Sequence, residues 1–163
     1  TGDRTPQTSL KTPFDERNGT FSPDVRWMAY QSNESGRDEI YVRPVAGTTA
    51  AGGQWQVSTN GGVLPRWRHD GRELCYLAPS AAMMAAPIAI TGASVAPGEP
   101  MTLFPTRIVG DGADLGLGRN YDVTRDGRFL VNTELSEPTA PITLLMTGIP
   151  TRSRSRRARY PWQ

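Results

Sequence analysis

The chain has 163 residues, including 17 glycines, 14 prolines and a single cysteine. One cysteine excludes an internal disulfide, and the absence of a run of 18 or more apolar residues excludes a sequence-evident transmembrane helix. The net charge of +2 comes from the C-terminal end, where five arginines fall within the last twelve residues: Arg152, Arg154, Arg156, Arg157 and Arg159. The remainder is net acidic, so the basic isoelectric point does not indicate a nucleic-acid-binding body.

Short β-strands separated by turns are expected along the chain, because glycine and proline are frequent and no stretch has helical spacing of apolar residues. A strand over Ser9–Thr12 is interpreted as the last strand of an earlier unit, within residues 1–16. The first full unit spans about 19–64, and its four strands are expected to end near Ser22 and to cover 26–32, 39–43 and 54–58.

Two further units are expected after the first. The second covers about 65–104, with strands over 65–68, 72–78, 83–90 and 101–104. A glycine-rich connection, 107–120, leads to a third unit over 121–147, whose third strand is expected at 141–146. Residues 148–163 are rich in arginine and serine with no apolar face, which predicts a disordered tail.

One ten-residue pattern occurs three times and is centred on Asp24, Asp70 and Asp126, at spacings of 46 and 56 residues. Each copy has an apolar residue three positions before the aspartate, an arginine two positions after it, and apolar residues four and five positions after it. This pattern predicts a strand, a tight turn and a second strand. The aspartates, with Gly71 and Gly127, are expected to be structural turn positions, since aspartate bonds nearby amides and glycine accepts positive φ.

The first copy departs from this pattern, because Val25 stands where the other two copies have glycine. A β-branched residue in the left-handed region costs roughly 1–2 kcal/mol. Either this turn has another geometry or it carries strain.

Repetition at this spacing predicts an all-β fold, a partial β-propeller of about three four-stranded blades plus one strand of a preceding blade. Three blades are not expected to close into a ring. An open arc would leave apolar blade faces in water, at a cost on the order of 10 kcal/mol. The chain is therefore expected to be a fragment of a larger propeller, with the remaining blades supplied in cis or by oligomerisation.

Several segments resemble the TolB-like (WD-like) β-propeller family, whose blades centre on a Phe/Trp-Ser-Pro-Asp-Gly hairpin. The segments are Phe21-Ser22-Pro23-Asp24, Ile40-Tyr41-Val42-Arg43-Pro44, Trp55-Gln56-Val57-Ser58 and Tyr121-Asp122-Val123. The resemblance is closest to the C-terminal propeller of bacterial eukaryotic-like serine/threonine kinases. It implies a bacterial protein, with the extracytoplasmic side favoured and the cytoplasm as the alternative.

The resemblance implies a non-catalytic interaction or sensor module that binds a protein, peptide or glycan. Two alternatives stay open: the C-terminal input domain of a bacterial serine/threonine kinase, and the propeller gate of a prolyl-oligopeptidase-type serine peptidase. The kinase signature motifs are absent from this sequence, so no enzyme activity is expected of this chain. No cofactor, metal or catalytic residue is expected, and neither nucleic acid nor a membrane is an expected partner.

Individual residues with reactive side chains have structural interpretations. His69 is the only histidine and occupies a turn position held by Pro23 and Arg125 in the other copies. Cys75 is expected in the core, and Trp27, Trp55 and Trp67 are expected to pack between strands. The segment 92–96 loosely resembles a nucleophile elbow, but Pro97 forbids the helix that such an elbow needs. Asp111 and Asp114 are interpreted as part of a solvated loop rather than a calcium site.

Overall fold

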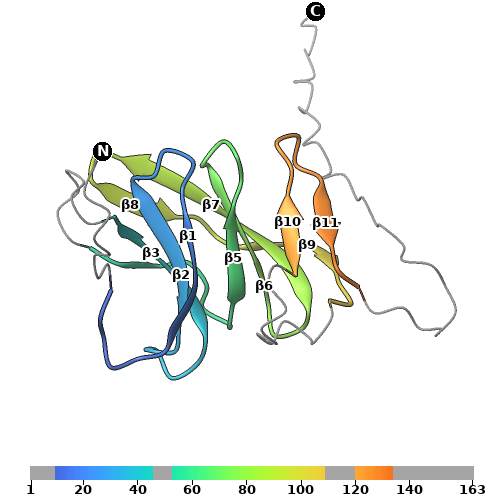
Figure 1. Ribbon diagram of the computed structural model, residues 1–163, viewed down its shortest axis with the longest axis horizontal. Coiled ribbons are helices and arrows are strands. Elements are labelled where there is room, and N and C mark those ends of the chain that lie inside the picture. Colours follow the sequence, from blue (N-terminus) through green and yellow to red (C-terminus); the bar gives the residue numbers. More distant parts are fainter. Residues whose placement is uncertain (1–9, 46–52, 109–119, 134–163) are drawn as a thin grey trace, which may run out of the picture.

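The computed structural model describes residues 10–45, 53–108 and 120–133. These residues contain eleven β-strands and no helix (Figure 1). The strands form three antiparallel sheets, none of which closes on itself. The predicted all-β class is therefore confirmed.

The first sheet has four strands in the order β1-β2-β3-β4. Their bounds are β1 Glu16–Phe21, β2 Trp27–Ser32, β3 Glu39–Pro44 and β4 Trp55–Gln56. The second and third strands begin and end within one residue of the prediction. The fourth is shorter than predicted. The Val57 amide still donates to the Ile40 carbonyl at 2.7 Å, but the Ile40 amide donates to the Ser58 hydroxyl at 2.8 Å, so the regular pairing stops at Gln56.

The strand expected over Ser9–Thr12 is wrong for the part that the structure describes, because residues 10–15 belong to no strand. Pro13 has no amide to donate, and the Phe14 amide donates to the Thr12 hydroxyl at 3.1 Å. The Asp15 amide donates to the Asn33 side chain at 3.0 Å. These local bonds replace a strand ladder, and regular pairing starts at Glu16.

The second sheet contains β5 Val63–Trp67, β6 Glu73–Leu77, β7 Ala82–Thr91, β8 Ser94–Pro97 and β9 Met101–Pro105. β7 is ten residues long and has two partners on one edge, β9 along its first half and β8 along its second half. β9 corresponds to the predicted fourth strand. β8 is not among the predicted strands; it forms because Gly92, at a φ of 60°, lets β7 turn directly back on itself.

The third sheet is the hairpin of β10 Tyr121–Val123 and β11 Phe129–Val131. An isolated bridge between Ile108 and Thr133 lies beside it. The predicted strand at 141–146 and the predicted tail at 148–163 lie outside the described residues, as does most of the connection 107–120.

The three hairpins β1–β2, β5–β6 and β10–β11 share one turn. The amide after each aspartate donates to the carbonyl two residues before that aspartate, at 2.8 to 3.0 Å: Val25 to Ser22, Gly71 to Arg68, Gly127 to Thr124. Asp24 and Asp70 each also accept the amide two residues later. Hydroxyl donors, Ser22 for Asp24 and Thr124 for Asp126, lower the pKa of these two carboxyls, which therefore stay ionised at neutral pH.

Val25 carries strain, because its φ is 58°, in the region that Gly71 and Gly127 occupy in the other turns. Its side chain is 57% exposed and contributes little to packing. We expect Val25→Gly to raise the free energy of unfolding by about 0.5–1 kcal/mol, since relief of the left-handed strain exceeds the added entropy of the unfolded chain. Chemical denaturation followed by circular dichroism measures this change. Val25→Ala keeps a Cβ, so its gain in the free energy of unfolding should be smaller. If Val25→Gly is no more stable than the wild type, Val25 is not strained.

The described residues form two core clusters, which lie on opposite sides of β6. Alternate residues of this strand point to opposite faces, so Leu74 and Tyr76 join one cluster while Cys75 and Leu77 join the other. The first cluster lies between the first two sheets and includes Trp27, Ile40 and Ile88. The second lies between the second sheet and the β10–β11 hairpin, and includes Met83, Ile108 and Phe129. Burial raises the pKa of the Cys75 thiol to about 12, so this thiol stays protonated at neutral pH.

Candidate functional site

A pocket of about 260 Å³ opens where the turns of the three hairpins meet. In Figure 1, β5 lies between β1 and β10, and β5 contacts both of these strands. Each of the three strands, with the turn that follows it, contributes to the wall. The lining residues are Thr20, Phe21, Pro23, Arg66, Trp67, His69, Asp122, Val123 and Arg125.

These lining residues occupy the same three positions in each hairpin. Counted from the turn aspartate, they stand four, three and one residues before it: Thr20, Phe21 and Pro23; Arg66, Trp67 and His69; Asp122, Val123 and Arg125. The position three before the aspartate supplies an apolar wall in every case. The other two positions supply side chains that differ between the hairpins. The three hairpins therefore contribute equivalent backbone positions to the pocket but side chains of different polarity and charge.

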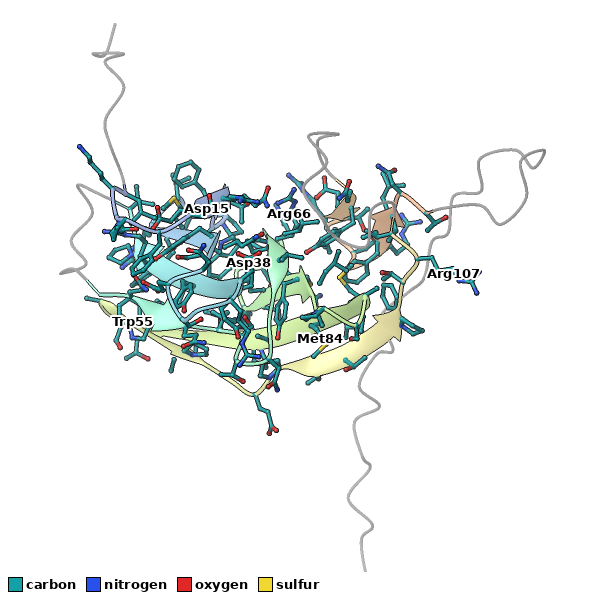
Figure 2. All side chains as sticks on the ribbon, turned by 90° about the horizontal axis from the view of Figure 1, so that it is seen from below. Asp15, Asp38, Trp55, Arg66, Met84 and Arg107 are labelled. Carbon is teal, nitrogen blue, oxygen red and sulfur yellow. The ribbon has the colours of Figure 1, made fainter. Side chains whose placement is uncertain are left out.

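Arg66 is the most constrained of the cationic side chains in the pocket. Its guanidinium lies over the Tyr121 ring, 5.8 Å from the ring centroid, and its Nη1 donates to the Pro65 carbonyl at 2.8 Å. The Tyr121 hydroxyl donates to the Leu64 carbonyl at 2.7 Å and so fixes the ring. Burial raises the pKa of Tyr121 well above its usual range, which keeps this hydroxyl a donor. Figure 2 shows Arg66 between the blue strands of the first sheet and the orange hairpin.

The pocket has more cationic than anionic groups. The Nε of Arg66 is buried and has no hydrogen-bond partner among the described residues. Within the same part of the chain, Arg125 and His69 have no hydrogen bond or ion pair. One carboxylate, that of Asp122, lines the pocket and accepts the Val123 amide at 2.9 Å. Two arginines therefore face one acid.

An apolar surface lies beside these charges. Phe21 is 56% exposed, which is unusual for a phenylalanine on a strand that packs against a second sheet. Trp67 is only 8% exposed and belongs to the core cluster between the first two sheets. The pocket thus has a rigid aromatic floor at Trp67 and an accessible aromatic ring at Phe21.

The five predicted turn residues lie next to the pocket but do not line it. Asp24, Asp70 and Asp126 hold the turns, and Gly71 and Gly127 have φ values of 68° and 83°. A Cβ added at Gly71 would stand 3.6 Å from the Pro23 side chain of the neighbouring turn, so the first two turns are in contact. The residues just before the aspartates form the wall.

The sequence did not identify His69 and Arg125 as pocket residues, because both were interpreted only as replacements for the turn proline. The signal in the sequence is the repeat itself, because His69 and Arg125 stand one residue before the turn aspartate, as Pro23 does. Positions four and three before the aspartate face opposite sides of the strand, and both reach the pocket because it lies at the strand end.

The other candidate sites are placed as follows. Ser94 is the first residue of β8, so a strand follows it and no nucleophile elbow forms. Asp111, Asp114 and the arginines after residue 150 lie outside the described residues. Among the residues that are described, no three histidine, cysteine, aspartate or glutamate side chains gather as a metal site requires. The same residues include no helix long and apolar enough to cross a membrane.

Comparison of the sequence with protein-family models and with curated proteins finds no match.

Proposed function

We propose that this chain is a non-catalytic binding module with a β-propeller-like arrangement, and that its ligand binds at the mouth between the three hairpin turns. In a propeller, blades are arranged radially around a central channel. Here β1, β5 and β10 would be the inner strands of three successive blades. The resemblance of the hairpin segments to TolB-like propellers favours the same arrangement.

The observation that carries this proposal is the composition of the pocket wall. Three hairpins separated by 46 and 56 residues place the same three positions around one pocket. A chance cavity between unrelated sheets would have no reason to use equivalent positions. Radial packing of equivalent hairpins produces this wall directly.

The strand pairing of the first two hairpins gives independent support. Phe21 pairs with Met28 and Trp67 with Leu74, so the register relative to each turn aspartate is the same. Both inner strands also have a register shift, with a residue of positive φ six positions before the aspartate: Asn18 in β1 and Leu64 in β5. The first two sheets therefore share the register of this hairpin and the position of its irregularity.

The third hairpin differs by one residue, because Val123 pairs with Phe129 rather than with the residue after it. Its turn still has the shared hydrogen bond from Gly127 to Thr124. A complete third blade would need two further strands, for which 141–146 is the predicted source of one. The blade count is part of this proposal.

A fragment screen against the full chain tests the binding role. We expect aromatic fragments to shift backbone ¹H–¹⁵N resonances around Phe21, Trp67 and Val123. Phe21→Ser should abolish these shifts. Leu130→Ser is the matched control, since Leu130 is also an exposed apolar residue on a strand but does not line the pocket. Shifts that persist in Phe21→Ser, or that cluster on another surface, would contradict the proposal.

A further inference from the structure

We infer that this pocket binds an organic carboxylate attached to an apolar group, with Arg66 and Arg125 holding the carboxylate and Phe21 contacting the apolar part. The inference rests on the proposed binding function and adds the chemical class of the ligand. It concerns the interior of the pocket rather than the turns around it.

Arg66 is the first reason. Its side chain is held by the Tyr121 ring and the Pro65 carbonyl, so little freedom is lost when a ligand binds. Its Nε is buried from solvent, so a ligand would meet the outer nitrogens of the guanidinium, of which Nη2 has no hydrogen bond among the described residues. A ligand oxygen there would supply an acceptor. Arginine also presents a planar group that matches the geometry of a carboxylate.

The balance of charge is the second reason, and it favours a monoanion. Arg66 and Arg125 bring two positive charges to the wall, and Asp122 brings one negative charge. A ligand with a single negative charge neutralises this set. A phosphate dianion would leave this set with a net charge of −1, and an uncompensated charge in a partly enclosed site is unfavourable.

The size and the apolar wall are the third reason. A pocket of about 260 Å³ is at or below the small end of sites that bind whole drug-sized ligands, so it suits a single side chain or terminal group. Phe21 is exposed at the same rim and offers a ring face for stacking. A carboxylate next to an aromatic or branched apolar group uses both parts of the wall.

The first test uses 3-phenylpropionate as the probe, with 3-phenylpropanamide as the isosteric neutral control and phenethylamine as a cationic control. Binding to the full chain is measured by ¹H–¹⁵N shifts and by titration calorimetry. We expect the carboxylate to bind at least tenfold more tightly than the amide, and the amine not to bind. Equal binding of the acid and the amide would overturn the carboxylate inference and leave the pocket itself standing. If none of the three binds and the fragment screen is also empty, the proposed function fails.

Variants separate the role of Arg66 from general electrostatics. Arg66→Gln should weaken 3-phenylpropionate binding at least tenfold, and Arg66→Lys should recover only part of it, since lysine keeps the charge and loses the stacked plane. Arg72→Gln is the matched control, because Arg72 is an exposed arginine in the same hairpin that does not line the pocket. Arg125→Gln, in an exposed turn, should weaken binding several-fold without affecting folding. Unchanged binding in both Arg66→Gln and Arg125→Gln would overturn the inference.

The carboxylate could belong to a small acid or to the C-terminus of a polypeptide, and peptide probes distinguish these sources. N-acetyl-Gly-Gly-Phe with a free carboxylate is compared with 3-phenylpropionate and with the C-terminal amide of the same peptide. Tighter binding of the free peptide than of the small acid supports a polypeptide end. Equal affinity supports a small acid as the ligand. Equal binding of the peptide and its amide would argue against recognition of the carboxylate.

Discussion

Replacing Trp27 with alanine is expected to lower the free energy of unfolding by about 3–5 kcal/mol, as large aromatic truncations in packed cores do. Trp27 is completely buried between the first two sheets and meets Trp55 edge to face, with ring centroids 5.7 Å apart. Its loss would leave a cavity where the two sheets join. Guanidinium denaturation followed by far-ultraviolet circular dichroism would measure the effect.

A second substitution at the same position makes this prediction sharper. The indole Nε1 of Trp27 is buried and has no hydrogen-bond partner among the described residues. Trp27→Phe removes that donor and keeps most of the ring, so it should cost much less than Trp27→Ala. An equal loss in both variants would mean that the indole N–H has an acceptor and would contradict this account of the core.

Glu39→Ala is expected to lower the free energy of unfolding by about 2–4 kcal/mol, because two donors lose their acceptor while remaining buried. Glu39 is 1% exposed at the start of β3. Its carboxylate accepts the Gly61 amide at 2.9 Å, the Ser58 hydroxyl, and an ion pair from Arg37 at 3.1 Å. This group fixes the connection that leaves the first sheet and enters the second. The effect should be visible as a lower denaturation midpoint with an unchanged slope.

Two variants serve as references for Glu39. Glu39→Gln retains one carbonyl acceptor but places an amide donor against the other partner. Its free energy of unfolding should therefore lie between those of the wild type and Glu39→Ala. Glu99→Ala removes an exposed carboxylate and should change stability by less than about 0.5 kcal/mol. A loss in Glu39→Ala as small as that in Glu99→Ala would show that the Ser58–Gly61 connection does not depend on the buried carboxylate.

The hairpins were predictable from sequence because their turns depend on local chemistry. Asp70 and Gly71 prescribe a turn by a side-chain hydrogen bond and a positive φ, and the apolar residues on either side prescribe strands. Val25 shows the limit of this reasoning, since its context imposed the glycine-like conformation on a residue that disfavours it. β8 was missed because Pro97 and Pro100 favour a loop. Pairing with the second half of the long strand β7 overrides that preference.

The pocket was beyond sequence reasoning for a different reason. The repeat identifies positions such as Arg66 and Asp122 as equivalent, but equivalence along the chain does not say that they face one another. That requires the relative placement of three sheets, which depends on long-range packing such as that of Tyr121 against Leu64 and Arg66. His69 was assigned correctly to a turn, yet the turn also forms the rim of the pocket.

The position just before each turn aspartate is occupied by proline, histidine and arginine in the three hairpins, at Pro23, His69 and Arg125. The turn keeps its shared hydrogen bond with any of the three, so the backbone places almost no demand on this side chain. Under the proposed binding function, mutations there would alter what the pocket recognises and leave folding unchanged. In evolutionary terms, the proposed module would be a scaffold whose specificity changes one hairpin at a time.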